Sequence, residues 1–439
     1  MQNNDFITRK SLSMLFKNKT SVFSALVRGE KGRLEFCFPL PVIKRGKGQF
    51  IYDYDGNRYI DFFLSNGDLL IGHSHPQLTK VLKGWLGRGY APGYLQVGLE
   101  MLANKLENTF FNNSKNKEQR NRKWFFFPSY ESLIFFLPAL LDIFNSDFRE
   151  IFYFSSDTAY KTKIKDLPKI GAHQCGAIGN EKNLFFKGSN YREYTISLFL
   201  KKFKVISGSE SSTDKSSVDE SRVSEIEHIR NSLCLIELNP SMNADFLIKT
   251  LNTLKKNGNF VLSIEKDFSS YLFLNEHRKL LAFIDGRILG SWMASGLPIT
   301  AIYFSNFIGL ATSGITENSL IESIGAGIWV PPLFIIKGTI RAINLFNKLG
   351  GVERYIQKLS HLYSFLDDRW FKYNSGSIFI AANQWIIDNW KDIYFLLLNK
   401  GIFLSPSIVH PLYISLVHED EALKKYAKKI NSIFMEYSR

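Results

Sequence analysis

Short apolar runs alternate with longer amphipathic segments along most of this chain. The runs are only four or five residues long, and they occupy 124–127, 151–154, 233–237, 260–264, 281–284 and 301–304. Continuous apolarity over so few residues is typical of strands that helices bury on both faces. The pattern therefore predicts six strands of a mostly parallel sheet in an α/β fold.

Helical periodicity separates these runs. Residues 99–110 and 246–256 repeat apolar positions every three or four residues, as helices with one buried face do. Between the runs at 151–154 and 233–237, residues 207–224 are rich in serine and contain no aromatic residue. Such a segment buries too little apolar surface to offset the entropy of ordering it, so we expect a mobile insertion.

The last hundred residues mix helix and strand patterns. Residues 392–400 are predicted to form a helix that ends before Gly401, and 402–404 and 412–416 to form strands. A final amphipathic helix is predicted at 419–437. Its apolar face consists of Leu423, Tyr426, Ala427, Ile430, Ile433 and Phe434.

Length and charge narrow the class of protein. A chain of 439 residues suits two or three compact units. The 55 basic and 41 acidic side chains leave a net charge of +14, which attracts polyanions. The lysines are scattered and accompany no zinc-ligand spacing or RNA-binding signature, so solvated surface lysine is the preferred interpretation. A basic nucleic-acid-binding protein stays as the second alternative function.

The cysteines and the apolar runs bear on the compartment. Cys37, Cys175 and Cys234 are far apart and odd in number, which argues against a disulfide framework and for a reducing compartment. Residues 1–19 lack the apolar core of a secretory signal, and no uninterrupted apolar run reaches the length of a membrane span. We therefore expect a cytoplasmic protein.

Four motifs near the ends and in the middle of the chain match one family. They are Lys47-Gly-Gln-Phe-Ile-Tyr-Asp-Tyr-Asp-Gly-Asn-Arg-Tyr-Ile-Asp61, Ile71-Gly-His-Ser-His-Pro76, Leu289-Gly-Ser-Trp-Met-Ala-Ser-Gly-Leu-Pro298, and Gly401-Ile-Phe-Leu-Ser-Pro-Ser407 with Ser415-Leu-Val-His418. Together they resemble the class III aminotransferases of fold-type I, most closely the glutamate-1-semialdehyde aminomutases. The resemblance extends over almost the whole chain.

The resemblance implies an architecture and a cofactor. It implies an aspartate-aminotransferase-like fold around a seven-stranded, mostly parallel sheet, with a smaller α+β terminal domain. The expected divisions are an N-terminal arm and small-domain segment at 1–75, a large domain at 76–310 and a C-terminal small domain at 311–439. Members of the family bind pyridoxal phosphate (PLP) and build their cleft from two subunits, so a homodimer, or a heterodimer with an active relative, is expected.

Ser291 stands where the family has the lysine that forms a Schiff base with PLP. A hydroxyl cannot condense with the cofactor aldehyde, and it supplies no amine as a base. Gly290, Gly296 and Pro298 fix the alignment on both sides of Ser291 without a gap. Lys266 is the nearby lysine to weigh as a substitute, although it follows a different strand.

The phosphate-binding turn of the family is also altered. It falls on residues 127–132, where Ser129 and Glu131 are retained and Tyr130 replaces a threonine. Such turns aim backbone N–H groups at a phosphate from a helix N-terminus. Pro128 removes one of these N–H groups.

Three further positions align with residues that contact the ring or the phosphate of PLP in the family. Tyr160 aligns near the aromatic residue that stacks on the ring, and Thr316 near the threonine that closes the phosphate site from a second subunit. Ile264 stands at the aspartate that pairs with the pyridinium nitrogen, and isoleucine cannot stabilise the protonated ring. A shift of one residue would offer Glu265 instead.

Substrate-binding positions have changed as well. Ser24 and Arg28 resemble the residues that read the substrate carboxylate, Asn66 replaces a tryptophan, and His410 replaces a glutamate. His73 and His75 have no accompanying cysteine or carboxylate cluster, so no metal site is expected.

These changes favour a pseudoenzyme. The leading hypothesis is an aminomutase-like protein without catalytic activity and without PLP, which retains the fold for binding, scaffolding or regulation, with a small-molecule ligand possible in the former cleft. The alternative is an active PLP-dependent transaminase or aminomutase that uses an atypical lysine.

Overall fold

The computed structural model describes residues 41–88, 98–111, 123–134, 151–155, 203–207, 228–305, 330–381, 383–408 and 410–437. The chain forms two compact units. Unit 1 combines residues 1–80 with 344–439, and unit 2 comprises residues 81–343. The divisions expected from the sequence, at 75/76 and 310/311, stay a prediction. Apart from residue 207, the serine-rich segment 207–224 lies outside the described residues.

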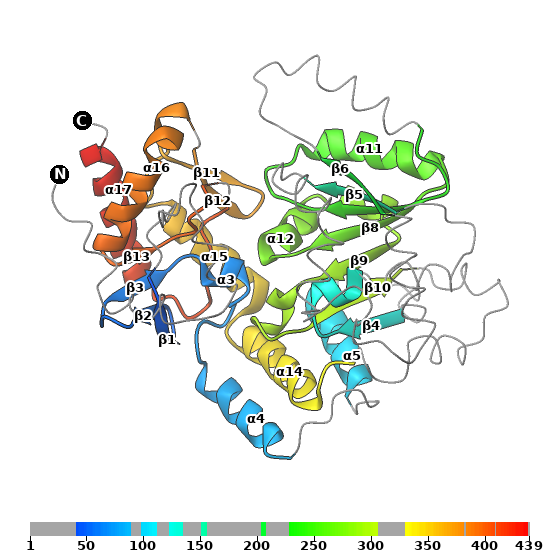
Figure 1. Ribbon diagram of the computed structural model, residues 1–439, viewed down its shortest axis with the longest axis horizontal. Helices are drawn as coiled ribbons and strands as arrows, with labels where there is room; N and C mark the ends of the chain where they lie inside the picture. The colour runs from blue at the N-terminus through cyan, green and yellow to red at the C-terminus, as the bar shows by residue number, and fades with distance from the viewer. Residues whose placement is uncertain are drawn as a thin grey trace, which may run out of the picture. The chain divides into compact units, whose positions relative to one another are not determined.

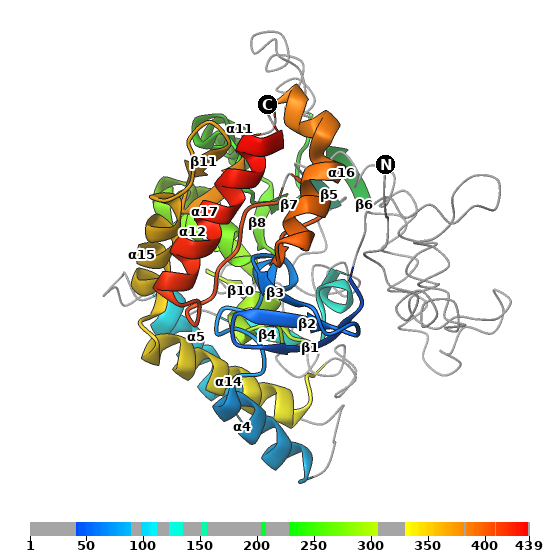
Figure 2. The same cartoon turned by 90° about the vertical axis from the view of Figure 1, so that its left-hand side faces the viewer.

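Unit 2 is built on a seven-stranded sheet, whose strands are labelled in Figure 1 except β7, which Figure 2 labels. Strand β10 is antiparallel to both of its neighbours, and every other adjacent pair is parallel. The mostly parallel α/β sheet expected from the sequence is therefore confirmed. In spatial order the strands are β4 (Lys123–Phe127), β10 (Thr300–Phe304), β9 (Gly286–Leu289), β8 (Phe260–Glu265), β7 (Leu233–Glu237), β5 (Ile151–Ser155) and β6 (Phe203–Ser207).

One expected strand is wrong. Residues 281–284 belong mostly to a 3-10 helix, η3 (Arg278–Phe283), in which Leu281 is 41% exposed. The strand of this region is β9, which contains Gly286 and Arg287 and so escapes a search for apolar runs. Glycine is required there because a Cβ at Gly286 would collide with the carbonyl oxygen of Tyr303 on β10.

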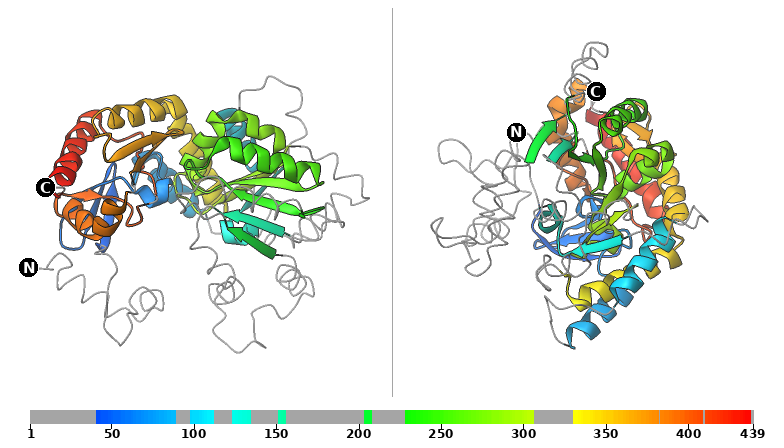
Figure 3. Two further views of the ribbon diagram at one scale, coloured as in Figure 1. Left: turned by 90° about the horizontal axis from the view of Figure 1, so that it is seen from above. Right: turned by 90° about the vertical axis from the view of Figure 1, so that its right-hand side faces the viewer.

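Helices cover one face of this sheet (Figure 3). Helix α11 (Ala244–Lys256) begins at Asn243, whose side chain accepts hydrogen bonds from two N–H groups of the first turn, and α12 (Phe268–Glu276) begins at Asp267 in the same manner. The α11 face of the sheet is where apolar side chains of α11, α12 and η3 pack on Phe152, Cys234, Ile236 and Val261. Because strand side chains alternate, Tyr153, Glu237 and Ile264 belong to the opposite face.

Unit 2 contains further helices. Helix α5 (Leu99–Phe110) has the bounds expected from the sequence and buries Leu102, Leu106 and Phe110. Helices α4 (Pro76–Leu86) and α14 (Leu333–Lys348) each cross the division between the units.

Unit 1 is an α+β unit whose helices Figure 2 labels. Its main sheet has the order β1 (Ile43–Lys47), β2 (Phe50–Asp53), β3 (Arg58–Asp61) and β13 (Ile402–Phe403), and β11 (Phe371–Asn374) pairs with β12 (Ser377–Ile380). Its helices are α15 (Gly351–Tyr363), α16 (Gln384–Asn399) and α17 (Asp420–Tyr437), with a short turn α3 (Leu64–Gly67) after β3.

Most C-terminal expectations hold. The six apolar residues expected on the last helix are all buried in α17, and Gly401 has a φ of +75°, as a glycine that ends a helix should. The helix expected at 392–400 is the second half of α16. The strand expected at 412–416 is wrong, because in this stretch Leu412 makes a single bridge to Ile378 and the following residues turn towards α17.

The two aspartates Asp53 and Asp61 of the motif at residues 47–61 make hydrogen bonds that hold the local fold. The Asp53 carboxylate accepts from the backbone N–H groups of Asp55 and Asn57 and from the Tyr59 hydroxyl at 2.8 Å. The Asp61 carboxylate accepts from two backbone N–H groups of the following turn and lies 2.7 Å from Nε2 of His73. Within the described residues no group of three potential ligands could hold a metal ion.

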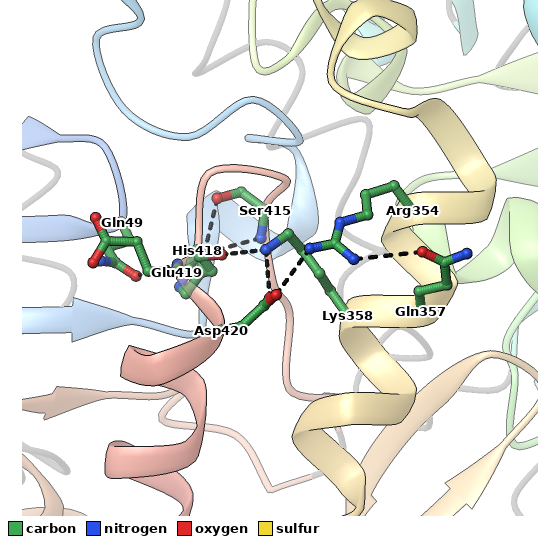
Figure 4. A network of polar contacts seen from close by, with 8 residues as sticks. All are labelled: Gln49, Arg354, Gln357, Lys358, Ser415, His418, Glu419 and Asp420. Carbon is green, nitrogen blue, oxygen red and sulfur yellow. Dashed lines mark hydrogen bonds and ion pairs between the residues drawn. The ribbon is translucent and has the colours of Figure 1, made fainter.

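A fully buried histidine, His418, belongs to a network of polar contacts in unit 1 (Figure 4). Nδ1 of His418 accepts hydrogen bonds from the N–H of Ser415 at 3.1 Å and lies 2.8 Å from its hydroxyl. Its ring stacks on Phe62, and Nζ of Lys358 donates to its carbonyl oxygen at 2.6 Å. Burial lowers the pKa of His418 to about 4 against an opposing effect of Asp61, while Lys358 and His73 lower it further. The ring is therefore neutral at pH 7.

His418 makes the stability of the protein depend on pH. Its pKa is about 4 when folded and 6.5 as the ordinary value, so its full contribution is present above pH 6.5 and is lost as the pH falls towards 4. At one pKa unit per 1.36 kcal/mol, the loss is roughly 3 kcal/mol. Urea denaturation at pH 7 and pH 4.5 should show this slope, and His418→Gln should flatten it. Equal slopes for both proteins would contradict the assignment.

Candidate functional site

Polar side chains collect at the C-terminal edge of the parallel strands of unit 2. Glu237 ends β7, Lys266 directly follows β8, and Ser291 follows β9 and begins the short helix η4 (Ser291–Ala294). In open α/β sheets, ligands bind outside the carboxyl ends of the strands. This edge is therefore the candidate site.

The residues that flank Ser291 have structural reasons to be there. The N–H of Gly290 donates to the carbonyl of Glu265, and a Cβ at Gly290 would collide with the backbone carbonyl of Lys266. Gly296 has a φ of +83° and closes the turn by donating to the carbonyl of Ser291. The motif thus holds β9 against the end of β8 whether or not residue 291 carries an amine.

Strand β8 places Ile264 and Glu265 on opposite faces of the sheet. Ile264 is fully buried and pairs in register with Glu237, on the face that also carries Tyr153. Glu265 points to the α11 face, where its two carboxylate oxygens accept from Nε and Nη2 of Arg287 at 2.5 and 2.6 Å. The carboxylate that a shift of one residue would offer, Glu265, is thus paired with Arg287 on the α11 face.

The Glu265–Arg287 pair lies in an aromatic environment. The guanidinium lies 4.4 Å from the centroid of the Phe111 ring, and the indole N–H of Trp292 donates to the carbonyl of Glu265 at 2.8 Å. Burial alone would lower the pKa of Arg287, but the Glu265 carboxylate and the Tyr303 hydroxyl raise it above its ordinary value. Both side chains are charged and fully committed to each other.

Breaking this pair should be costly. Glu265→Leu leaves the Arg287 guanidinium buried without a counter-charge, and we expect a loss of about 3–5 kcal/mol in the free energy of unfolding. Replacing both partners, by Glu265→Leu with Arg287→Met, removes the charges together and should cost clearly less. Urea denaturation of the three proteins measures both values. A single variant no less stable than the double variant would contradict this account.

The turn at residues 127–132, which aligns with the phosphate turn of the family, caps its own helix. Ser129 precedes a helix that begins at Tyr130, and its hydroxyl accepts from the N–H of Ser132 at 3.2 Å and lies 3.1 Å from the Ser132 hydroxyl. Glu131 is exposed. The Ser129 hydroxyl and the Ser132 N–H are therefore used within the turn, and Tyr130 is half-buried beside them.

An amine and a carboxylate meet at this edge, shifted from the positions that the family uses. Nζ of Lys266 lies 2.7 Å from one carboxylate oxygen of Glu237, and the Tyr153 hydroxyl donates to the other at 2.7 Å. The same Nζ lies 5.5 and 5.8 Å from the ring centroids of Tyr130 and Tyr153. Burial, then Tyr130 and Glu237, raise the pKa of Tyr153 well above its ordinary value. We call these four residues the Lys266 network.

Sequence reasoning missed Glu237 and Tyr153 and set Lys266 aside. A signal was present, because Glu237 is the last residue of one apolar run and Lys266 comes two residues after Ile264. Adjacent parallel strands end at the same edge, so charged residues at their ends tend to meet.

The residues at this edge differ from those that the family resemblance assigns to PLP binding. Ser291 offers no amine, Ile264 places an apolar side chain on the ring-facing strand position, and Glu265 is held on the other face by Arg287. A half-buried Tyr130 lies in the phosphate turn, and its ring lies against the Lys266 amine. The lysine present at this edge is paired with a carboxylate.

The remaining expected site residues lie in unit 1 or outside the described residues. Asn66 belongs to the α3 turn, in which it has a φ of +64°, and Oδ1 of Asn66 accepts from the Tyr413 hydroxyl at 3.4 Å. Nδ1 of His410 lies 2.9 Å from the hydroxyl of Ser405. The others, Ser24, Arg28, Tyr160 and Thr316, lie outside the described residues.

Comparison with known proteins agrees with the motifs. Residues 37–111 match the model of the class-III aminotransferase family. The glutamate-1-semialdehyde 2,1-aminomutase of Alkaliphilus metalliredigens is 53% identical over 53 residues, which is 12% of this chain and 12% of that protein. The chain thus matches only a small part of the length of this curated relative.

Solved structures match over nearly the whole chain. A transaminase with PLP bound is 17% identical with a TM-score of 0.64, over 99% of this chain and 100% of that one. An omega-transaminase from Sphaerobacter thermophilus is 13% identical with a TM-score of 0.66, over 100% of both chains. The chain therefore carries a class-III aminotransferase signature in residues 37–111 on the fold of the fold-type I PLP-dependent transaminases.

Proposed function

We propose that this protein is a catalytically inactive relative of the aminomutases, which uses the aminotransferase fold for binding, scaffolding or regulation. The observation that carries the proposal is the Lys266 network beside Ser291. In it, the amine at the strand edge is paired with Glu237 and lies against Tyr130 and Tyr153. The groups that PLP chemistry needs are absent at 264 and 291, and the space at the phosphate turn holds an aromatic side chain.

The energetic argument concerns cofactor affinity. Hydrogen bonds to charged groups contribute roughly 1.5–3 kcal/mol each. Losing two or three such contacts lowers affinity on the order of a thousandfold or more. A protein with Ile264, Ser291 and Tyr130 at these positions is therefore expected to hold no PLP.

The alternative is a PLP-dependent enzyme that uses an atypical lysine. Two observations favour it: solved structures of this fold include a transaminase with PLP bound, and Lys266 places an amine at the correct edge of the sheet. That amine lies 2.7 Å from the Glu237 carboxylate, and this ion pair would have to be broken before the amine could act as a nucleophile. We therefore rank this alternative second.

A reduction experiment separates the two. Purified protein incubated with PLP and reduced with borohydride should yield no pyridoxyl-lysine by peptide mass spectrometry, and the unreduced protein should be colourless. A pyridoxyl adduct at Lys266 that is lost in Lys266→Arg would overturn the proposal and favour the atypical lysine.

A series of substitutions that restores the residues of the family tests the same proposal. Ser291→Lys alone should bind PLP weakly and turn over no amino donor, because Ile264 and Tyr130 remain. Adding Ile264→Asp, Pro128→Ser and Tyr130→Thr should tighten PLP binding measurably. An ordinary turnover rate in the single variant would mean that the site was never dismantled.

We also propose that the protein forms a homodimer, or a heterodimer with an active relative, in a reducing cytoplasmic environment. The family resemblance supports the dimer, and three dispersed cysteines support the compartment, of which Cys234 is buried and free. The described helices include none with the length and apolarity to cross a membrane.

Sedimentation velocity at micromolar concentration should give the mass of a dimer for the purified chain, because two-fold pairing is expected from the resemblance. If the chain sediments as a monomer alone, co-expression with an active aminomutase of the same host should recover a heterodimer. A monomer under both conditions would contradict the dimer proposal.

A further inference from the structure

A second feature of the molecule lies on the β1–β2–β3 sheet of unit 1. Register places Arg45 on β1, Tyr52 on β2 and Arg58 on β3 in one row across the three strands. Lys47 and Phe50 form the adjacent row. Paired residues of neighbouring strands point to the same side, so these side chains share one face.

A β-bulge adds a further cation to this face. The register of β1 and β2 shifts between Ile43 and Arg45, so Lys44 is the extra residue of the bulge. Its Nζ lies 5.9 Å from the centroid of the Tyr54 ring. Tyr54 comes two residues after Tyr52, so it continues the alternation that puts Phe50 and Tyr52 on one face. We call Lys44, Arg45, Lys47 and Arg58 the basic face.

The two arginines of the basic face are held flat on aromatic rings. The guanidinium carbon of Arg45 lies 4.2 Å from the centroid of Tyr52, and that of Arg58 lies 4.7 Å from the centroid of Phe50. A stacked guanidinium keeps its N–H edge available for a planar anion, and stacking reduces the rotamer freedom lost on binding.

The charges of the basic face are not neutralised by neighbouring carboxylates. All four cations are exposed, and none forms a salt bridge with a described carboxylate. The strands of this sheet contain two acids, Asp53 and Asp61, which are 3% and 2% exposed. The Asp53 carboxylate accepts from Asn57 and Tyr59, and the Asp61 carboxylate accepts from the turn after β3 and lies beside His73. Asp55 lies half-buried in the turn, where its N–H donates to Asp53.

We infer that the basic face binds the phosphodiester backbone of a single-stranded nucleic acid. Arginine forks match phosphate oxygens, and the Tyr54 ring, 37% exposed beside Lys44, offers a surface on which a base can stack. The net charge of +14 draws such a polyanion towards the protein. A lipid surface fits less well, because the exposed apolar side chains here are confined to Ile43 and Tyr54.

The test compares two variants that remove the same charge. Arg45→Gln with Arg58→Gln removes two cations from the basic face. Lys425→Gln with Lys428→Gln removes two exposed cations from α17 and is the matched control. Binding is measured by fluorescence anisotropy with a labelled single-stranded RNA of mixed sequence and with DNA of the same sequence, and thermal denaturation verifies that each variant folds.

We expect the arginine variant to bind more weakly and the lysine control to bind as the unchanged protein does. The arginine variant should lose on the order of a hundredfold or more in affinity, since it removes two charge-assisted contacts and each is expected to contribute roughly tenfold or more. Its salt dependence should fall by roughly 1.4 in slope, two contacts at about 0.7 each. The lysine control should change both quantities little. Equal binding of RNA and DNA indicates recognition of the backbone, and preference for RNA indicates added contacts to the 2′-hydroxyl; either supports the inference.

Three outcomes would overturn it. One is no binding of either nucleic acid at low salt. Another is an equal loss in the two variants, which would mean that overall charge, not the basic face, attracts the polymer. The third is tighter binding to anionic phosphatidylserine vesicles than to RNA, lost in the arginine variant, which would assign the face to a membrane. None of these results bears on the PLP experiment, because no residue of the basic face belongs to the site in unit 2.

Discussion

The ion pair between Glu265 and Arg287 determines which side chains at the end of β8 face each side of the sheet. Because both groups are buried and charged, neither can leave the α11 face without leaving its partner uncompensated. That constraint fixes the alternation of β8, so Ile264 must point to the opposite face and Lys266 must follow it there. The chemistry available at the site edge is therefore set by a pair of residues that takes no part in it.

The Lys266 network follows from the same alternation. With Lys266 on the face of Glu237 and Tyr153, an amine and a carboxylate meet one strand away from where the family places its own. Each oxygen of Glu237 is satisfied, and two aromatic rings cover the ammonium. A polar group at a sheet edge is expensive to leave unpaired. This network gives the edge a stable arrangement that needs no cofactor.

Much of the fold could be predicted from the sequence, because buried parallel strands are short and continuously apolar. That rule found β4, β5, β7, β8 and β10. It failed at β6, where Lys204 interrupts the apolar run, and at β9, where Gly286 makes room for β10 and Arg287 is neutralised by a partner 22 residues earlier. Pairing across strands is a tertiary property that no local pattern reports. The same limit explains why Ser291 and Ile264 could be identified by alignment while Glu237 and Tyr153 could not.

The residues that survive in the family motifs are those on which the backbone depends. Gly290 is pressed against the carbonyl of Lys266, and Asp53 and Asp61 saturate the N–H groups of two tight turns. Replacing any of them would cause a collision or leave buried donors unpaired, and the cost would fall on folding itself. An amine at 291 supports no such contact. If catalysis is absent, as we propose, the constraint on residue 291 is removed while the constraint on the glycine beside it remains.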